Sequence, residues 1–164
     1  MQGPWLRSNS SVGFTLVELV LVIALLGILG AVAFPKFFTL TPYTNRFFYD
    51  DVRSSLRYAE KYAVGTGCHT QVNITATTLT LNRRSNCTSG SFTAAVVDPS
   101  NPAATSYTRT APTGITMTTG GGSWPFYFDA LGVARQVSDT TINTFTVTVG
   151  TQTITVYGMT GYVQ

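Results

Sequence analysis

The sequence has 164 residues, of which 44% are hydrophobic and 10% charged, with a formal net charge of +3. This length allows one domain with a modest core, and the apolar content excludes a disordered chain. The small net charge argues against a dedicated electrostatic nucleic-acid binder. One histidine, seven carboxylates and two cysteines leave little material for a metal or acid–base site.

An apolar run over Phe14–Phe34 is the first predicted element, and Glu18 is its single charge. A helix of this length covers about 31 Å, the thickness of a bilayer core. A secretory signal peptide would have a basic start and a shorter apolar run, so the residues favour a membrane anchor. Glu18, one turn from the start of the run, is either an interfacial carboxylate that reaches the headgroups or a buried group with a partner, such as the amino group of a neighbouring chain.

The stretch Gly13-Phe14-Thr15-Leu16-Val17-Glu18, followed by uncharged apolar residues, resembles the class III signal of type IV pilins and pseudopilins. The resemblance implies a leader, residues 1–13, that prepilin peptidase removes by cutting between Gly13 and Phe14, with N-methylation of Phe14. It also places Glu18 at the fifth position of the mature chain, where it would pair with the terminal amine of a neighbouring subunit. The leader holds Arg7 as its only charge, which is fewer basic residues than leaders of the family carry.

Residues Tyr43–Ala63 have the period of an amphipathic helix that ends before Gly65 and Gly67. The apolar stripe consists of Phe48, Val52, Leu56, Ala59 and Ala63. The opposite face carries Arg46, Asp50, Arg53, Arg57, Glu60 and Lys61. Because charges of opposite sign lie three residues apart on this face, we interpret it as solvated rather than as a binding patch.

Pro35 and Pro42 lie between the two helical stretches, and Gly27 and Gly30 lie upstream. Each proline removes a backbone donor, so a kink or an interruption is expected. The residues alone allow two helices, whereas the resemblance favours one bent helix that can unwind over 27–42. The expected divisions are a membrane or filament-core helix at 14–34 and a kinked continuation at 35–66.

From residue 70 onward apolar residues alternate with polar ones, as in half-buried strands. The expected strands include Val72 to Ile74, Leu79 to Leu81, Ser91 to Val97, Ile115 to Thr118, Pro125 to Asp129, Phe145 to Val149 and Ile154 to Val156. Asp98 to Thr113, with three prolines, is expected to be a loop, and Gly120 to Gly122 a flexible connection. Gly150-Thr151 fits a two-residue hairpin. Residues 67–164 thus form the β-rich part of an α+β fold, with a helix packed on an antiparallel sheet.

Three further stretches sharpen the resemblance. Residues 128–135 are similar to a hairpin of the H-type minor pseudopilins and related minor pilins, and residues 154–163 are similar to the ending of that group. Residues 51–64 with Gly67-Cys68 look most like the C-type minor pilin of the mannose-sensitive haemagglutinin (MSHA) system. The resemblance implies a type IV pilin-like fold, in which a long N-terminal helix has a membrane-spanning half and an amphipathic half.

Cys68 and Cys87 are the two cysteines and enclose 18 residues. A domain behind such a signal lies outside the cytoplasmic membrane, so we predict that they form a disulfide. A metal site with His69 lacks further ligands, and a bridged cysteine has no thiolate for His69 to activate, so a surface histidine is expected. Arg83-Arg84 is either exposed solvated charge or a DNA contact. Four arginines against three aspartates over residues 69–164 disfavour DNA.

These features predict a structural protein, not an enzyme, with no cofactor and no metal. The resemblance implies an MSHA-type minor pilin that is a structural or priming subunit of a filament. The alternatives are an H-type minor pseudopilin of type II secretion and a minor pilin that binds DNA or a surface. The expected partners are other pilin subunits, prepilin peptidase, the inner-membrane assembly platform and membrane lipid. The expected location is the inner membrane of a bacterium, with a single pass and a periplasmic C-terminal domain, and then a pilus or pseudopilus.

Overall fold

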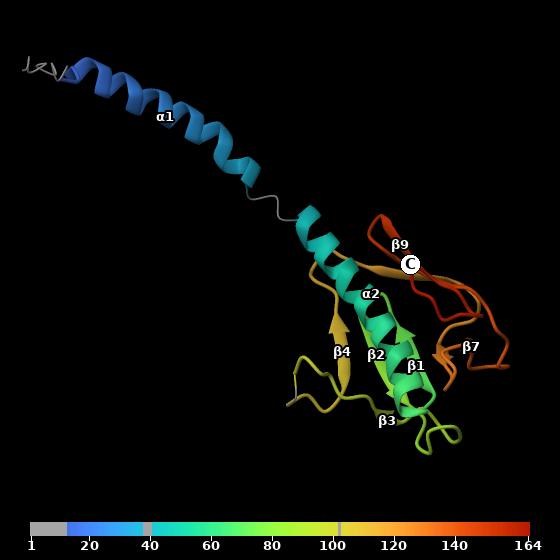
Figure 1. Cartoon of the computed structure of the whole chain (residues 1–164). Helices are drawn as coiled ribbons and strands as arrows, with labels where there is room; N and C mark the ends of the chain where they lie inside the picture. Colours follow the sequence, from blue (N-terminus) through green and yellow to red (C-terminus); the bar gives the residue numbers. More distant parts are fainter. Residues whose placement is uncertain (1–12, 38–40, 102) are drawn as a thin grey trace, which may run out of the picture. The chain divides into compact units, whose positions relative to one another are not determined.

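The structure is a computed structural model that describes residues 13–37, 41–101 and 103–164, without the side chains of 32–37, 41 and 42. The chain divides into two units, Met1–Leu40 and Thr41–Gln164. In the first unit one helix, α1 (Leu16–Phe37), contains the predicted apolar run from its third residue to its last (Figure 1).

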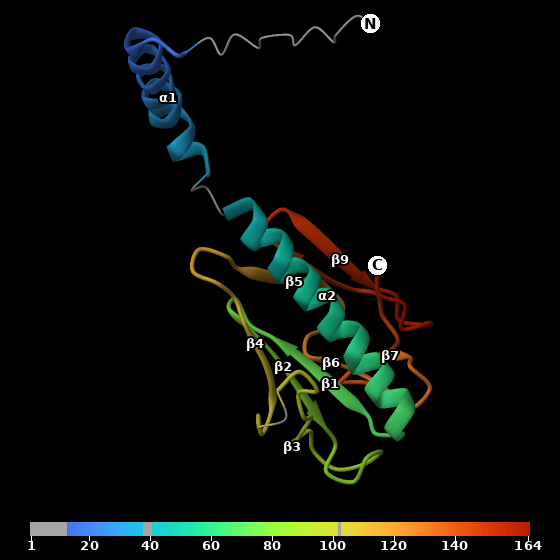
Figure 2. The same cartoon turned by 60° about the vertical axis from the view of Figure 1, so that its left-hand side comes forward.

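Helix α2 (Thr41–Thr66) starts the second unit and lies across one face of the strands (Figure 2). The five residues of the predicted apolar stripe are all buried, with Val52, Leu56, Ala59 and Ala63 fully so. They pack against β1, β6 and β8, whose bounds follow. The helix ends at Thr66, within the pair of glycines that the sequence marks as its end. This confirms the predicted buried face of the amphipathic helix, which runs one residue past Gly65.

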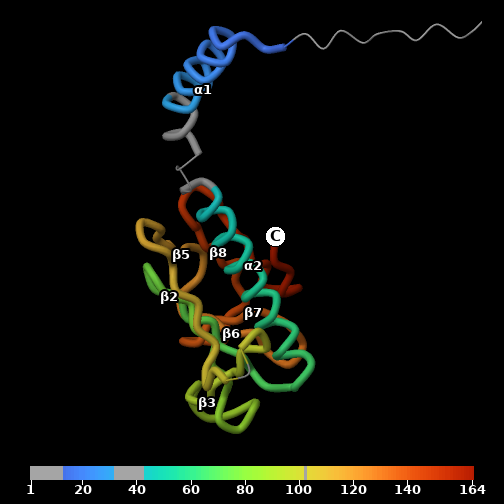
Figure 3. Tube along the Cα trace, turned by 90° about the vertical axis from the view of Figure 1, so that its left-hand side faces the viewer, coloured from blue at the N-terminus to red at the C-terminus, as the bar shows by residue number. Residues whose placement is uncertain are grey.

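The larger sheet has six antiparallel strands in the order β3-β2-β1-β6-β7, with β4 also paired to β2. Its strands are β1 (Thr70–Ile74), β2 (Thr78–Arg83), β3 (Ala94–Ala95), β4 (Tyr107–Thr110), β6 (Phe126–Phe128) and β7 (Ala134–Gln136). Strands β1 and β2 pair Val72 with Leu81, so the alternating apolar residues of both strands face the helix side of the sheet together. Figure 3 shows β3 and β5 near opposite ends of the second unit.

The smaller sheet has three antiparallel strands in the order β5-β8-β9. Its strands are β5 (Met117–Gly121), β8 (Phe145–Val149) and β9 (Gln152–Val156). Val149 pairs with Gln152, so Gly150 and Thr151 form the predicted two-residue loop. Gly150 has a φ of 59°, the positive value that the first loop residue of a type II′ hairpin requires.

The core between α2 and the two sheets centres on aromatic rings. Phe126 of the larger sheet and Phe145 of the smaller sheet are fully buried and stack with their ring centroids 4.3 Å apart. Trp124 packs edge-on against both rings. One continuous core therefore joins both sheets to the helix, although the strands that supply it come from distant parts of the sequence.

Three strand predictions need correction. The expected loop at 98–113 contains β4, where Tyr107 is buried and pairs with Leu81 of β2. The expected strand from Ser91 to Val97 is reduced to β3, Ala94–Ala95. Gly120 and Gly121 are not a flexible connection but the end of β5, paired with Thr146 and Phe145 of β8. For β4 and for Gly120 and Gly121, cross-strand pairing overrides the local signal from proline or glycine.

Candidate functional site

The start of α1 is held by a side-chain cap. The Glu18 backbone N–H donates to Thr15 Oγ1 at 3.2 Å, and the Leu19 N–H donates to the Thr15 carbonyl oxygen at 3.2 Å. The Thr15 hydroxyl therefore satisfies one of the N–H groups that the first helical turn leaves without a partner, and its carbonyl oxygen accepts the first intrahelical hydrogen bond. Sequence analysis missed this role, although threonine followed three residues later by glutamate is a known N-terminal helix signature. Gly13 and Phe14 lie just before the cap, and both are exposed.

The described surface of α1 is apolar and uncovered. Every described side chain over residues 13–31 is exposed, including Leu16 at 79% and Leu26 at 62%. Glu18 is exposed and forms no ion pair with another described residue. Apolar surface left in water is unfavourable by about 25 cal/mol per Å². This helix therefore gains stability from any apolar environment or neighbouring helix that covers it.

The positions expected to weaken the helix have different surroundings. Gly27 and Gly30 lie inside α1, which continues unbroken past both, and open space surrounds each of them. Pro35 lies within α1, and Pro42 is the second residue of α2. Residues 38–40 between the helices lie outside the described residues, and so does the predicted leader of residues 1–13 apart from Gly13. Over the part of the chain that is described, no helix has both the length and the hydropathy of a membrane span.

A disulfide joins Cys68 and Cys87, the pair predicted from the sequence. It ties the segment just before β1 to the turn after β2. The His69 N–H donates to the Cys87 carbonyl oxygen at 2.8 Å, and the Cys87 N–H donates to the Arg84 carbonyl oxygen at 3.2 Å. The bridge and these backbone bonds hold together the end of α2 and the first hairpin of the larger sheet.

Arg84 is not the exposed, solvated charge that the sequence suggested. Its guanidinium lies 4.4 Å from the ring centroid of Phe92 and 5.4 Å from that of Tyr127, and its Nη1 donates to the Gly90 carbonyl oxygen at 2.5 Å. His69 also stacks on Tyr127, with ring centroids 5.2 Å apart. Burial and the nearby Arg84 cation lower the pKa of His69. The Arg84 guanidinium therefore packs against these rings and is not free to contact a DNA phosphate.

Arg109 holds two carboxylates that sequence analysis left unassigned. Its Nε donates to Asp51 Oδ1 of α2 at 3.1 Å, and its Nη1 donates to Asp98 Oδ2. Asp98 is buried, and these Arg109 hydrogen bonds, helped by those from Ser100, hold the pKa of its carboxyl far below the usual range. The guanidinium also lies 4.3 Å from the ring centroid of Tyr107. This group joins α2, β4 and the segment that precedes β4, so it serves structure rather than catalysis.

The turn between β6 and β7 depends on another carboxylate, Asp129. Its Oδ1 accepts the N–H groups of Leu131 and Val133 at 2.9 and 3.0 Å, and its Oδ2 accepts Arg135 Nε at 2.8 Å. Burial opposes ionisation, but the Arg135 and backbone hydrogen bonds outweigh it and lower the pKa of Asp129. Gly132 has a φ of 81°, which a residue with a side chain adopts only with strain. The stretch noted in the sequence at 128–135 is thus a hairpin built around Asp129.

No cluster of three or more potential metal ligands occurs among the residues that the structure describes. The predicted site residues fall into two groups: Gly13, Phe14 and Glu18 in the first unit, and the disulfide in the second. The described part of the second unit uses its carboxylate–arginine pairs to fasten loops. The described residues thus comprise an exposed apolar helix and a domain whose loops are held by ion pairs.

Comparisons with known proteins give one partial match in sequence and two matches in fold. No family model matches the sequence. A stretch of 54 residues, 33% of this chain, is 44% identical to the "Type IV narrow pilus major component PilA5" of Thermus thermophilus, and it spans 45% of that relative, less than half its length.

Two solved structures are similar in fold. The minor pseudopilin EpsH from the type 2 secretion system of Vibrio cholerae aligns with a TM-score of 0.50 at 14% identity, covering 73% of this chain and 93% of EpsH. The type IV minor pilin FimU of Pseudomonas aeruginosa PAO1 aligns with a TM-score of 0.47 at 14% identity, over 76% of this chain and 90% of FimU. The likeness to EpsH confirms the predicted fold class, an α+β pilin-like fold with a helix packed on antiparallel sheet.

Proposed function

We propose that this chain is a subunit of a filament of the type IV pilin and pseudopilin class, and that its role is structural. The observation that carries the proposal is α1, whose described side chains are all exposed and, apart from Glu18, uncharged and apolar. Such a helix needs a covering of lipid before assembly and of neighbouring helices afterwards. The partial identity to a pilus component and the fold shared with a pseudopilin support the same class.

In this proposal prepilin peptidase cuts between Gly13 and Phe14 and methylates the new terminus. The apolar sequence of Phe14–Phe34 holds the processed chain in the inner membrane, with the second unit in the periplasm. The last three residues of that run have side chains outside the described part. The disulfide supports the periplasmic placement, because such bridges persist in oxidising compartments. The inner-membrane assembly platform then moves the subunit from lipid into the filament.

Glu18 has the assembly role in this scheme. Its carboxylate, one turn into the apolar run, would pair with the methylated amine of Phe14 on a neighbouring subunit. In the absence of water such a pair is strongly favoured, because an unpaired charge in an apolar environment is costly and a charge-assisted hydrogen bond offsets that cost. The pair therefore sets the register between adjacent helices.

Within this class we propose an MSHA-type minor pilin that acts as a structural or priming subunit. The sequence similarity of residues 51–68 to the C-type minor pilin supports this assignment. The alternative is an H-type minor pseudopilin, supported by the similarity of residues 128–135 and 154–163 to that group. A DNA-binding pilin is disfavoured, because Arg84 of the Arg83-Arg84 pair is engaged with Phe92 and Tyr127.

The test is the state of the N-terminus in cells of the source organism, with and without active prepilin peptidase. We expect a mature chain of 151 residues, the 164 of the sequence less the 13 of the leader, that starts at N-methylated Phe14 and co-purifies with sheared filaments. Gly13→Val should leave the leader attached, because the cut site accommodates backbone almost without a side chain. Gly30→Ala, in open space on α1, is the control that should be processed normally. An intact N-terminus in peptidase-positive cells would sink the proposal.

A further inference from the structure

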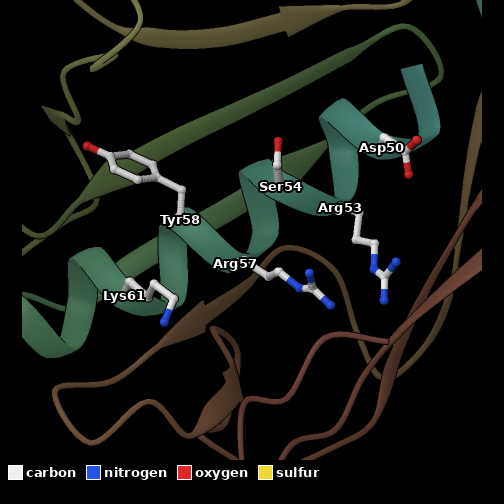
Figure 4. A pocket seen from close by; sticks show the side chains of 6 residues that line it. All are labelled: Asp50, Arg53, Ser54, Arg57, Tyr58 and Lys61. Atoms are coloured by element: carbon white, nitrogen blue, oxygen red, sulfur yellow. The ribbon is translucent and has the colours of Figure 1, made fainter. Parts of the chain in front are cut away.

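The cations of the second unit lie in two kinds of surroundings. Arg57 and Lys61 are exposed on α2, where they border a hollow of about 340 Å³ (Figure 4). Arg84 is instead half-buried over the rings of Phe92 and Tyr127, and it forms no ion pair with another described residue. Water screens the charge of Arg84 less, so a second positive charge beside Arg84 is more unfavourable than one beside the cations of α2.

Arg84 and His69 meet on the face of the larger sheet that points away from α2. The two residues that flank Tyr127 in β6 point into the core, so Tyr127 points to the other face. Its side chain is nonetheless buried, because Phe92, Arg84 and His69 lie against its ring. The Arg84 N–H donates to the His69 carbonyl oxygen at 3.1 Å, which extends the pairing of β1 with β2 by one position.

The cover over this ring belongs to one turn. We call residues 84–92, the turn after β2, the flap. Its Arg84 and Phe92 lie against the ring of Tyr127, and the disulfide ties it to the sheet at Cys87. The flap can therefore lift these two side chains off the ring while the bridge keeps the turn attached.

The His69 ring is placed so that a second proton has no acceptor. Its Nδ1 is buried without a hydrogen-bond partner in the described part of the chain, so we assign the hydrogen of the neutral ring to Nε2. A protonated ring carries hydrogen on both nitrogens, and the one on Nδ1 would be a buried donor without an acceptor, which is costly. Arg84 Nε is already such a donor in the same cluster. Protonation of His69 therefore adds an unsatisfied donor as well as a charge.

The charged groups around His69 also oppose its protonation. Burial and the Arg84 cation lower the pKa of His69, and Arg135 of β7 acts in the same direction. Asp129, in the turn after β6, raises this pKa, but its carboxylate is in an ion pair with Arg135. The other titratable group against the ring is Tyr127 of β6, on whose face His69 stacks. The closed flap thus disfavours a proton on His69 that the open flap would accept.

We propose that His69 is a pH switch for the flap: a proton on its ring drives Arg84 and Phe92 off Tyr127, while the disulfide keeps the turn attached. In acid surroundings the two aromatic rings are then open to solvent. The switch lies within the second unit, so it operates whether or not the chain enters a filament. Because the open form takes up its proton near the ordinary histidine pKa of about 6.5, the closed form is fully stable above this pH and loses stability below it.

The experiment is NMR spectroscopy of the full chain in detergent micelles. The ring C–H signals of His69, the one histidine of the chain, give its pKa, which should lie below about 6.5. Hydrogen exchange at the amides of Arg84 and Ser85, corrected for the intrinsic rate at each pH, measures opening of the flap. Protection should fall at least about threefold from pH 7 to pH 5, and at most about 25-fold, the limit for one proton. The aspartates do not interfere, because a carboxyl with a lowered pKa keeps its stabilising effect above about pH 4.

Three variants separate the switch from a general effect of acid. His69→Phe keeps a ring on Tyr127 and binds no proton, so flap protection should agree within about twofold at the two pH values. Arg84→Met fills the space over the rings without a charge and should raise the pKa of His69 toward its ordinary value. Arg83→Met removes the same charge one residue earlier, where the side chain points to the opposite face of the sheet, and should leave the titration of His69 unchanged.

Four outcomes would overturn the inference. These are an ordinary pKa for His69, equal flap protection of the wild type at both pH values, the same acid loss in His69→Phe, and an equal acid loss at the amides of β8 and β9, which would mean that the whole domain unfolds. If His69→Phe does not fold, the wild-type titration and the two arginine variants still decide. Equal effects of Arg84→Met and Arg83→Met on the pKa of His69 would contradict the role of Arg84.

Discussion

At the scale of single residues, Asp98 shows how this unit uses its few charges. Arg109 brings together Asp98, Asp51 of α2 and Ser100 Oγ, the last at 3.3 Å from Nη2. The same segment is fastened to α2 by Tyr58, whose hydroxyl donates to the Val97 carbonyl oxygen at 3.1 Å. A buried carboxylate in such a group is stabilising only while it stays ionised, because its neutral form loses the contact with the guanidinium.

Asp98→Asn should lower the free energy of unfolding by about 2–4 kcal/mol, since it leaves Arg109 with an incomplete set of acceptors. The folded-state pKa of Asp98 lies below its unfolded value, so its contribution is complete above about pH 4 and is lost as the pH falls further. The difference in stability between wild type and variant should therefore shrink at acid pH. Urea unfolding of the full chain in detergent, followed by the fluorescence of Trp124 in the core, measures it.

The matched control is Asp139→Asn. Asp139 is exposed, and its carboxylate accepts the Thr141 N–H at 3.0 Å, a bond that an asparagine oxygen also accepts. Its effect should stay within about 0.5 kcal/mol at every pH. If the two variants unfold alike, the Arg109 group does not contribute to stability.

At the scale of elements, the disulfide adds a covalent link between the start of β1 and the turn after β2, two strands that backbone hydrogen bonds already pair. Cys68 lies between α2 and β1, and Cys87 lies in the turn that carries Arg84 toward Phe92 and Tyr127. Strand β3, with two residues, adds little pairing at this end of the sheet. The bridge therefore limits the opening of residues 84–92 more than any hydrogen bond there.

Replacing both cysteines with serine should lower the free energy of unfolding by about 3 kcal/mol, the effect of releasing a loop of this length from the unfolded state. Hydrogen exchange should show the first loss of protection at the amides of Arg84 and Cys87, which bond within the bridged turn. The amides of β8 and β9, in the other sheet, are the internal reference and should change last. Ready thiol labelling of native wild-type protein without reductant would contradict the argument.

At the scale of the whole molecule, a braced domain is attached to a helix whose described surface is apolar and exposed. The domain and α1 differ in how far their apolar side chains are buried. The domain buries its own core and pairs three of its carboxylates with arginines, whereas every described side chain of α1 is exposed. In the proposed function, assembly with other subunits is the step in which α1 gains its packing. Glu18 is the one ionisable group among its described side chains.

Glu18→Ala should leave membrane insertion and cleavage after Gly13 intact while reducing the amount in filaments about tenfold or more. The Thr15 cap accepts the backbone N–H of residue 18, which alanine retains, so helix formation is not the cause. Glu18→Gln, of equal size but neutral, should assemble as poorly if charge pairing sets the register. Immunoblots of membrane and sheared filament fractions measure both. Normal incorporation of either variant would leave Glu18 as an interfacial carboxylate without an assembly role.

The local sequence pattern was sufficient to predict many of the helices, strands and turns of this protein. The stripe from Phe48 to Ala63 predicted the buried face of α2, because helical period and burial coincide along one continuous segment. The alternating residues of β1, β2, β8 and β9 and the Gly150-Thr151 turn were predicted for the same reason. The disulfide was predicted because the chain has two cysteines and the domain that holds them is expected in an oxidising compartment. The exposed apolar helix and its carboxylate also follow from sequence, since they depend on no distant partner.

Tertiary structure decided the features whose partners lie far along the chain. Strand β4 exists because Tyr107 and Arg109 meet β2 and α2, which no local pattern among the prolines of 98–113 indicates. Gly120 and Gly121 are strand because β8 pairs with them, and Arg84 is half-buried because Tyr127, more than forty residues later, returns beside it. A short polar segment has nearly equal free energies as loop or strand, so the neighbours that folding brings to it determine its structure.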